Sequence, residues 1–513
     1  MTTPRVLKLI AKDRETSWTF TLALCIPYFL FLVWMHAHHE MWRDEVHAWT
    51  LARLAQNFRE LVTGDRVYEG HPPLWFWYLR VWTWVTKSVW GLQVATIFPA
   101  TGAAILLARY APFPRFVKVP LLFSFHYGFE FTVMSRNYVL GWFLLCWFCA
   151  AYHPLRLRHW VLACALALLS MTSFYGLVMS FFLLMYLLLD QLRIGLTSRS
   201  EAPPSEIRLS ISPRILVTAV IAASAYLWVV QVINPPDPNP YSSGFFFDAV
   251  TPASIHDMLY RLTAGYLPWR KFDTGQFWWE PYSFWDRKEA WYNYTGGALF
   301  ILSLLALLPS WRLILAYLGA IAVMQIFQQA RMEGSPRHWG HYLMIFVALC
   351  WLLRVRYPKR SHWVSTVVLA AVFLIQIEGF IVATVIDTRD NFSGAHETAA
   401  FIRKAGLEDL PIVAGPDAVV STITGTLRRD FFACETEEIN QTIAFHSRRR
   451  PFSRERLLEK AVSVSRERGS RVLMISNQDL PEAPAGSSRD LIFTSKPGAI
   501  GDEIFRVYAL QVR

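Results

Sequence analysis

Long apolar runs follow one another through the first three quarters of the chain. A run of about 20 apolar residues forms a helix long enough to cross the hydrocarbon core of a bilayer. The pattern therefore predicts a polytopic α-helical membrane protein with about 11 spans, within a range of 10–13. The expected spans lie near residues 17–36, 93–109, 116–131, 138–152, 159–172, 174–191, 214–233, 295–309, 311–330, 339–353 and 363–385.

The stretch LWFWYLRVWTWVTKSVW at 74–90 is also apolar, but it contains Arg80 and Lys87. Its Trp side chains favour the membrane interface. If this stretch does not cross the membrane, the basic loops at 109–118 and 354–362 fall on the same side as the N-terminus. Basic loops mark the cytoplasmic side. We therefore expect 74–90 to lie along the membrane surface, the N-terminus to be cytoplasmic and the C-terminus to lie outside.

The polar tail, residues 386–513, has a different pattern. PIVAG (411–415) and RVLMIS (471–476) are typical of buried strands, and ERLLEKAVSVSRERG (455–469) has helical spacing. EIFRVYALQV (503–512) is typical of a final strand. The tail is therefore expected to form a small soluble α/β domain on the outer, periplasmic side.

The remaining residues, 1–385, are expected to form one transmembrane domain. Within it, 43–92 is predicted to be a first outer loop with amphipathic or interfacial helices. Residues 234–294 are predicted to be a long outer loop, which begins with NPPDPNP, a sequence that cannot form a regular helix.

Composition agrees with a membrane protein and limits the partners. The chain of 513 residues is 54% hydrophobic and 17% charged, with a net charge of +11. No basic run is interleaved with aromatic residues in the manner of a nucleic-acid surface, so no nucleic-acid partner is expected. Five of the six cysteines lie in apolar runs, which argues against a disulfide framework.

Polar and ionisable residues gather at the turns that are expected on the outer side. Such groups at the ends of spans are costly unless they have partners or a water-filled cavity. Their position on one side predicts a single polar site at the outer membrane surface. The candidate residues are Asp44, Glu45, His47, His71, Arg136, Tyr138, Tyr175, Arg337, His338 and His341.

Asp44 and Glu45 directly follow the first apolar run and precede the amphipathic stretch EVHAWTLARLAQNFREL (45–61). Asp is a favoured N-cap, so Asp44 could serve only to start a helix. Alternatively, Asp44 is a general base that removes a proton from a hydroxyl group, and Glu45 positions it or binds substrate hydroxyls.

His71, Arg136 and Arg337 are candidates for phosphate binding. Pro72 and Pro73 force an extended chain after His71, which fixes the direction of its side chain, although His71 could also be an exposed loop histidine. Arg136 could extend to lipid headgroups, or it could clamp a phosphate with its guanidinium. Arg337 lies in a similar position before a later span.

His338 and His341 could belong to a metal site, but their spacing of three residues has no HExxH-type context. The same holds for His36, His38 and His39. We therefore expect no metal and no required cofactor, and we expect His338 and His341, with His47, Tyr138 and Tyr175, to contact or support the substrate.

These segments resemble the GT-C superfamily of integral-membrane glycosyltransferases, of the protein O-mannosyltransferase and lipid A aminoarabinose transferase type. The resemblance is most specific over 43–79, in the acidic pair and EGHPPLWFWYL. MSRNYVLGWFLL (134–145), SFYGLVMSFFLL (173–184) and SPRHWGHYLMIF (335–346) are similar to later motifs of the superfamily. One departure is that Asn137-Tyr138 follow Arg136, where some members carry a second acidic group.

The resemblance implies that residues 1–385 are a catalytic domain in a bacterial inner membrane. It implies an inverting glycosyltransferase that takes a hexosyl or pentosyl group from a polyprenyl-phosphate carrier, with Asp44 as the base. His71 and an arginine such as Arg136 or Arg337 are then expected to bind the phosphate. The acceptor hydroxyl could belong to a glycan, a lipid or a protein. The alternatives are a polytopic transporter or lipid flippase, and a non-catalytic scaffold.

Overall fold

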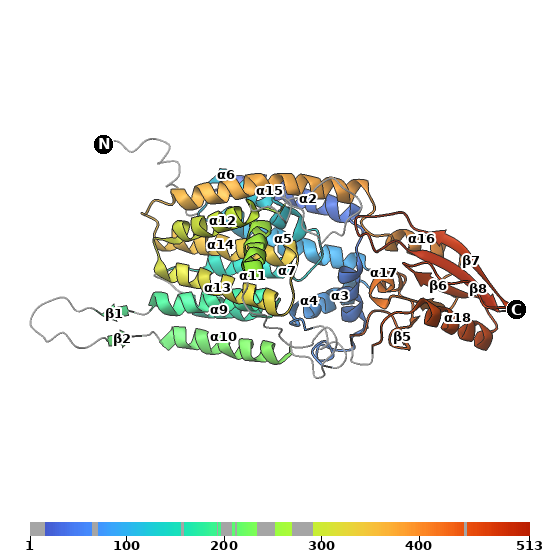
Figure 1. Ribbon diagram of the computed structural model, residues 1–513. Helices are drawn as coiled ribbons and strands as arrows, with labels where there is room; N and C mark the ends of the chain where they lie inside the picture. The colour runs from blue at the N-terminus through green and yellow to red at the C-terminus, as the bar shows by residue number, and fades with distance from the viewer. Residues whose placement is uncertain are drawn as a thin grey trace, which may run out of the picture.

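The structure is a computed structural model, and it divides into a helical domain and a sheet domain at one end of it (Figure 1). Most helices of the helical domain run along the long axis of the molecule. The end that carries the sheet domain is called the sheet-side end below. The structure describes residues 16–63, 70–154, 158–191, 193–195, 208–210, 213–232, 252–268, 291–445 and 449–512.

Seven of the described helices are long and apolar enough to cross a membrane, so the chain is an integral membrane protein. These seven helices are α2 (Trp18–His38), α5 (Trp90–Tyr110), α9 (Phe174–Gln191), α10 (Pro213–Val232), α13 (Trp311–Ala330), α14 (Pro336–Arg356) and α15 (Trp363–Arg389). Three shorter apolar helices lie beside them, namely α7 (Tyr138–Ala151), α8 (His159–Ser170) and α12 (Trp291–Leu307).

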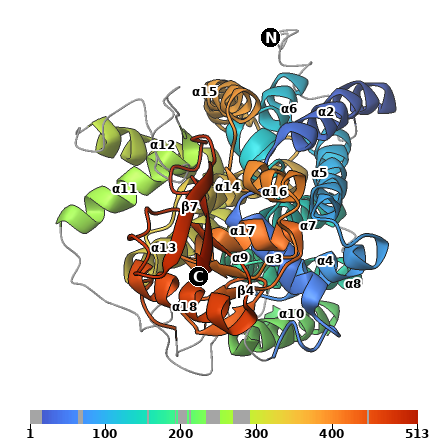
Figure 2. The ribbon, with the colours of Figure 1, turned by 90° about the vertical axis from the view of Figure 1, so that its right-hand side faces the viewer.

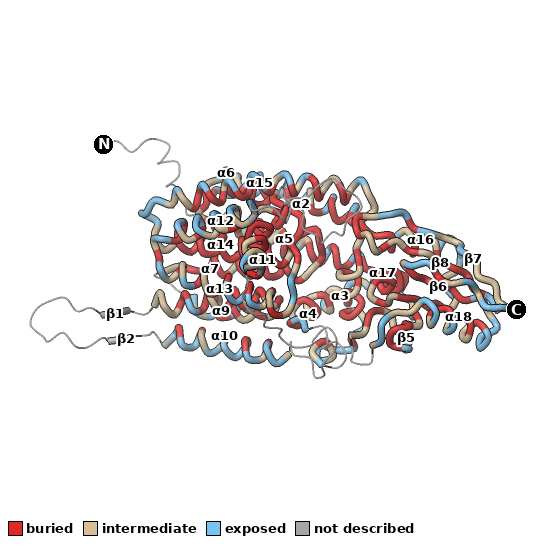
Figure 3. Tube along the Cα trace, viewed as in Figure 1, coloured by how far each residue is buried: buried red, intermediate tan, exposed pale blue. Residues whose placement is uncertain are grey.

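Helix α14 is the centre of the helical domain, since 89% of its most apolar 18-residue stretch is buried inside the protein. The tube in Figure 3 shows buried residues along most of the inner helices and exposed residues on the outer ones. Exposed side chains on the outer helices are mostly apolar, for example Leu30 of α2 and Leu227 of α10. In a membrane protein this apolar surface faces lipid rather than water.

The expected span at 116–131 is not a single helix. The chain forms a short helix α6 (Arg115–Leu122) and then a π-helical turn η2 (Phe125–Glu130). Gly128 permits the turn, because a Cβ atom there would lie 2.9 Å from the carbonyl oxygen of Leu122 and 2.8 Å from the ring of Phe380. Close backbone packing, which hydropathy does not report, thus interrupts this span.

The aromatic stretch 74–90 contains helix α4 (Leu74–Val85), which has 12 residues. At about 1.5 Å per residue such a helix covers about 18 Å, too little to cross a bilayer. It packs against α3 (Arg43–Leu54) at the sheet-side end (Figure 1). The amphipathic stretch was predicted at 45–61, but the helix that it forms, α3, ends at Leu54.

The predicted long loop at 234–294 contains a helix, α11 (Pro252–Tyr266), whereas 234–251 and 269–290 lie outside the described residues. α11 packs against α12 and α14. Buried polar side chains bind the backbone of its last turn. For example, His126 Nε2 lies at hydrogen-bond distance, 2.9 Å, from the carbonyl oxygen of Gly265. This part of the range is therefore a packed helix rather than an extended loop.

The sheet domain follows α15 and has the predicted α/β composition. Its six strands have the order β5-β4-β3-β6-β8-β7, with β4, β3 and β6 parallel and the others antiparallel. The strands are β3 (Ile412–Ala414), β4 (Phe431–Ala433), β5 (Glu438–Asn440), β6 (Val472–Ser476), β7 (Ser487–Thr494) and β8 (Arg506–Val512).

Three helices cover the two faces of this sheet. α16 (Ala395–Lys404) and α17 (Asp417–Leu427) pack on one face and α18 (Arg454–Arg468) on the other, each over its own apolar cluster. The predicted strands near 411–415, 471–476 and 503–512 are confirmed, as is the helix near 455–469. A separate pair of short strands, β1 (Arg193–Gly195) and β2 (Arg208–Ser210), lies far from this sheet (Figure 1).

The sheet domain is packed directly against α3. In Figure 2, α17 lies in front of α3 at the centre of the sheet-side end. A Cβ atom on Gly425 would lie 2.7 Å from side-chain atoms of Val46 and Thr50, so the two helices touch without a side chain between them. Arg43 forms a bidentate ion pair with Asp502, at 2.8 and 2.9 Å. The sheet domain therefore fixes the position of α3.

Candidate active site

The start of α3 is capped by Glu45 rather than by Asp44. Trp42 is the N-cap residue, and Glu45 Oε2 accepts a hydrogen bond from its N–H group at 3.1 Å. Asp44 is the second residue of the helix and makes no cap contact of this kind. N-capping is therefore not the role of Asp44, and its carboxylate is available for another.

Asp44 lies between two arginines from distant parts of the chain. Its Oδ2 is 2.8 Å from Nη1 of Arg136 and 3.2 Å from Nη2 of Arg337. Asp44 keeps 28% of its side-chain surface exposed, whereas Arg136 and Arg337 keep 14% and 17%. Burial alone would raise the pKa of Asp44, but Arg136 and Arg337 lower it to about 2. We call these three residues the open cluster.

Each arginine of the open cluster is held by its own element. Arg136 lies in the turn between η2 and α7, and the preceding N–H of Ser135 donates to Glu45 Oε1 at 2.6 Å. Arg337 is in the first turn of α14, and its guanidinium lies over the ring of Trp42 at 5.2 Å from the centroid. The Nε of Arg337 is buried and has no hydrogen-bond partner among the described residues.

A second cluster lies beneath the first and is sealed from solvent. His39 places Nε2 3.0 Å from Glu45 and Nδ1 2.9 Å from Asp387, the latter near the end of α15. All three side chains are fully buried. Burial would lower the pKa of His39, but Asp387 and Glu45 raise it well above its ordinary value. We call Glu45, His39 and Asp387 the sealed cluster.

Glu45 joins the two clusters. Its carboxylate accepts from Trp42, Ser135 and His39, so both oxygens are occupied inside the protein. Of the two roles predicted for Glu45, these contacts fit the positioning of Asp44 and Arg136. They leave no exposed oxygen for substrate hydroxyls.

Four of the other predicted residues form an aromatic group beside Arg337. Tyr175 stacks on His341 with 4.6 Å between ring centroids, and Tyr138 meets the edge of the same ring at 5.1 Å. His338 lies 5.6 Å from Tyr175 and accepts the N–H of Ser335 through Nδ1 at 3.0 Å. The group is buried, and Tyr138 lies within electrostatic range of all three residues of the open cluster.

His71 and His47 lie on different sides of the site. His71 is exposed and close enough to His338 for an electrostatic interaction, as are Arg136 and Arg337. His47 instead faces the sheet domain, with Nδ1 2.5 Å from the hydroxyl of Thr442. The structure therefore places His71 within electrostatic range of His338, and it places His47 at the contact between the domains.

Three residues near the site were not singled out as site residues from the sequence. His39 was considered only as a metal ligand, and Asp387 and Glu130 were not considered. Glu130 is 3% exposed and lies at the end of η2, close enough to Tyr138 for an electrostatic interaction. Glu130 interrupts an apolar run and Asp387 lies at the end of one, which is the signal that would have found them.

Within the described part of the chain, no group of three or more His, Cys, Asp and Glu side chains could hold a metal ion. Neither His338 and His341 nor the histidines at 36, 38 and 39 form one. The histidines are instead occupied by local contacts, such as His36 Nε2 at 3.0 Å from the Thr132 oxygen.

Comparison with solved structures identifies the fold. The chain is similar to the crystal structure of ArnT from Cupriavidus metallidurans bound to undecaprenyl phosphate, with a TM-score of 0.56 over 96% of this chain and 98% of that chain. The chain has the GT-C fold. The sequences are 13% identical, so this likeness concerns the fold. No protein-family model and no curated protein sequence matches the chain.

The extent of the GT-C likeness matters as much as its score. Coverage of 96% takes in both the helical domain and the sheet domain, so the sheet domain is part of the shared architecture. The fold class expected from the sequence is thereby confirmed. A fold of this kind does not identify the chemistry, which has to be argued from the open cluster.

Proposed function

We propose that this chain is an inverting glycosyltransferase that moves a monosaccharide from a polyprenyl-phosphate carrier to an acceptor hydroxyl. The observation that carries the proposal is the open cluster, in which Asp44 meets Arg136 and Arg337 at 2.8 and 3.2 Å. One carboxylate beside two guanidinium groups supplies a base and a phosphate site at the same place. That the fold neighbour ArnT was solved with undecaprenyl phosphate supports the choice of donor.

The phosphate group of the sugar carrier binds to Arg136 and Arg337, and His71 donates a further hydrogen bond to it. Guanidinium groups suit phosphate because they offer parallel N–H bonds. The buried Nε of Arg337 has no partner among the described residues, and an unpaired buried donor is costly unless a ligand satisfies it. Two positive charges stabilise the phosphate as it leaves, so no acid is needed to protonate it.

Asp44 accepts the proton of the acceptor hydroxyl. The hydroxyl oxygen forms a bond to the anomeric carbon while the carbon–oxygen bond to the carrier phosphate breaks, and the phosphate leaves with the electron pair. A single displacement inverts the anomeric carbon. Bound phosphate shares the two arginines with Asp44, so the pKa of Asp44 rises from about 2 when the donor is present. Donor binding thereby makes Asp44 a stronger base.

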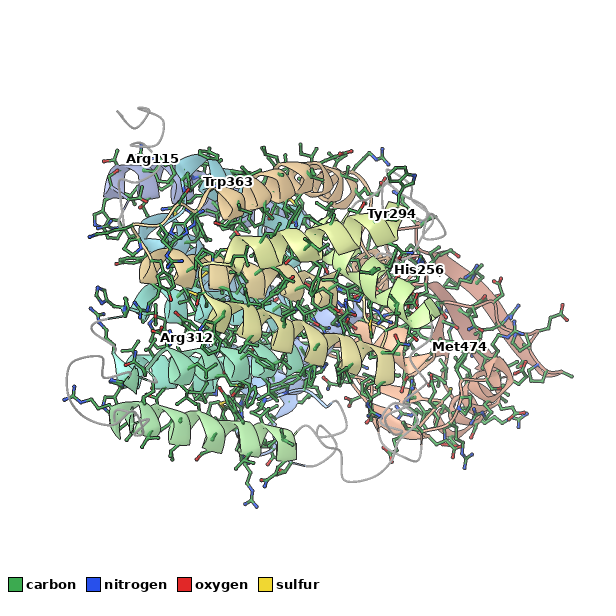
Figure 4. All side chains as sticks on the ribbon, turned by 60° about the vertical axis from the view of Figure 1, so that its left-hand side comes forward. Arg115, His256, Tyr294, Arg312, Trp363 and Met474 are labelled. Atoms are coloured by element: carbon green, nitrogen blue, oxygen red, sulfur yellow. The ribbon has the colours of Figure 1, made fainter. Side chains whose placement is uncertain are left out.

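We place the site at the outer face of the membrane, with the sheet domain outside and the N-terminus in the cytoplasm. The support comes from the opposite end of the helical domain, where Arg115 and Arg312 lie far from Met474 of the sheet (Figure 4). Arg356 is the last residue of α14, and Arg360 follows it on the same side. Basic residues near span ends mark the cytoplasmic side.

A transporter or lipid flippase remains the second candidate, because one observation favours it. The interrupted segment α6–η2 resembles the broken helices that transporters place near the membrane midplane. A flippase would keep its function without a general base. The Asp44→Asn variant therefore separates the candidates, since a transferase loses activity and a flippase keeps it.

The test uses the full chain in proteoliposomes and a strain that lacks the gene. Mass spectrometry of the surface glycans and lipids should show one sugar missing in the deletion strain. Wild-type protein should restore it, and Asp44→Asn should not. Restoration by Asp44→Asn would overturn the assignment of the base, and an unchanged glycan profile in the deletion strain would overturn the transferase.

A further inference from the structure

A second group of cations lies away from the open cluster, at the contact between the two domains. Arg53 in the last turn of α3, Lys87 between α4 and α5, and Arg428 at the end of α17 line a cleft of about 480 Å³ with Leu427. Among the described residues, none of these three cations forms an ion pair. Asp430 is close enough to Arg53 for an electrostatic interaction, but one carboxylate does not balance three converging cations. The remaining repulsion favours a further anion between them.

Arg53 is the most constrained of the three. Its Nη2 donates to Gln441 Oε1 at 2.7 Å, whereas its Nε is buried and has no partner within the described residues. Burial and the nearby Arg428 both lower its pKa, and Asp430 only partly opposes them. The buried Nε and the excess of positive charge thus both favour a further negative group beside Arg53.

Arg428 is held in a conformation that glycine would adopt more easily. Its φ is 59°, in the left-handed region, and it ends α17 where a glycine is usual. A side chain costs free energy in this conformation. Its presence therefore places a guanidinium at the cleft at some cost to the stability of the helix end.

The surface beside these cations is apolar. Trp84 and Val85 at the end of α4 are 63% and 76% exposed, and Trp90 at the start of α5 is also exposed. In the sequence, Lys87 lies between Val85 and Trp90, three residues before the span α5 begins. Exposed Trp together with Lys or Arg at the end of a span is the pattern of the headgroup region. A ligand for this surface carries both a phosphate and acyl chains.

We propose that the cleft formed by Arg53, Lys87 and Arg428 binds the phosphate headgroup of an anionic membrane phospholipid. The acyl chains then lie against Trp84, Val85 and Trp90. Because Arg428 belongs to the sheet domain and the other two cations to the helical domain, the bound headgroup ties the domains together at the membrane surface. This proposal is independent of the transfer reaction.

The test measures binding of short-chain phosphatidylglycerol to the full-length protein in detergent by native mass spectrometry, with phosphatidylcholine as the reference lipid. Each removed cation should weaken binding of phosphatidylglycerol about fivefold. Lys87→Gln tests the helical domain. Arg428→Gly tests the sheet domain and should keep or raise the melting temperature, because glycine accepts the positive φ.

Arg429→Gln is the matched control, since Arg429 adjoins Arg428 but pairs with Asp409 at 3.6 Å. It should bind phosphatidylglycerol like the wild type. Wild-type binding by both Lys87→Gln and Arg428→Gly would overturn the proposal, as would equal binding of phosphatidylcholine. Competition by inorganic phosphate at the concentration of the lipid would assign the cleft to a soluble anion instead. Asp44→Asn should bind the lipid normally, whatever its transfer activity.

Discussion

Asp44 and Glu45 are neighbours in the sequence, yet they belong to opposite kinds of environment. Asp44 is part of the open cluster, is 28% exposed and faces two arginines. Glu45 is part of the sealed cluster, is fully buried and has its oxygens occupied by His39 and two backbone N–H groups. The first turn of α3 directs Asp44 to the two partly exposed arginines and Glu45 into the protein interior.

The difference shows how the carboxylate of Asp44 is held in place. Glu45 bonds to the turn that carries Arg136 and to the start of the helix that carries Asp44. Its partner His39 bonds to Asp387 at the end of α15. The sealed cluster thus connects the turn before α7, the start of α3 and the end of α15. These connections fix the positions of Asp44 and Arg136 in the open cluster.

The largest effect is expected from Asp44→Asn. Asparagine keeps the shape of the side chain but cannot accept a proton, so the rate of transfer should fall by about 10²- to 10⁴-fold. The melting temperature should stay close to that of the wild type, because the site is partly open. The rate is measured with a polyprenyl-phosphate sugar in proteoliposomes. A drop of less than tenfold would remove Asp44 from the role of base.

Glu45→Gln should act on stability instead. His39 keeps Asp387 as its counter-ion, but Gln has one acceptor oxygen for the three buried N–H groups that point at Glu45. A buried donor without an acceptor costs about 1–3 kcal/mol. The melting temperature of the purified protein reports the loss. Glu459→Gln, on the exposed face of α18, is the control and should have little effect. A Glu45→Gln variant that is as stable as the wild type would contradict the distinction between the clusters.

Glu503 sharpens the comparison, because it is sealed like Glu45 but poorly compensated. Its Oε1 lies 3.8 Å from Nε of Arg43, and burial raises its pKa to about 7 despite that arginine. The unfolded chain loses this proton near pH 4.5, so Glu503 lowers stability as the pH rises from about 4.5 to about 7, by up to about 3 kcal/mol.

Glu503→Gln should therefore flatten the decline in melting temperature between pH 5 and pH 8. Glu40 and Glu435 have pKa values raised to about 7 as well, so part of the decline should remain in this variant. The comparison of the two melting curves isolates the contribution of Glu503. Identical slopes in the variant and the wild type would show that Glu503 is ionised in the folded protein.

The smallest effect is expected from Arg136→Lys. Lysine keeps the charge but offers no parallel N–H bonds, so binding of undecaprenyl phosphate should weaken about tenfold. The dissociation constant is measured by native mass spectrometry. Arg331→Lys, before the start of α14, serves as the control. Equal affinity of Arg136→Lys and the wild type would show that the open cluster recognises charge alone.

The sequence predicted the fold well wherever hydropathy governs it. Runs such as 17–36 and 363–385 became α2 and α15, and the strands of the tail lie where expected. The interruption at η2 was missed because it depends on Gly128 packing against Phe380 and the backbone of Leu122, a contact between distant segments. The helix α11 was missed because its amphipathic pattern stands beside a proline-rich start.

The sequence predicted which residues meet at the site better than it predicted how they are arranged there. The polar residues at span ends indicated Asp44, Arg136 and Arg337 correctly as neighbours, because a charge at the membrane surface needs a partner. Their separation into an open and a sealed cluster could not be predicted. It depends on Asp387, which is 348 residues away from His39, and on a turn of α3 that only the packed structure fixes.

The contact between Gly425 and α3 has a consequence for how this protein can diverge. With 2.7 Å between a would-be Cβ and the side chains of Val46 and Thr50, a larger residue at position 425 needs a smaller one opposite. Related chains should therefore change positions 46, 50 and 425 together, across a domain boundary, and hybrids that join the helical domain of one to the sheet domain of another should lose activity unless these three residues are transferred as a set.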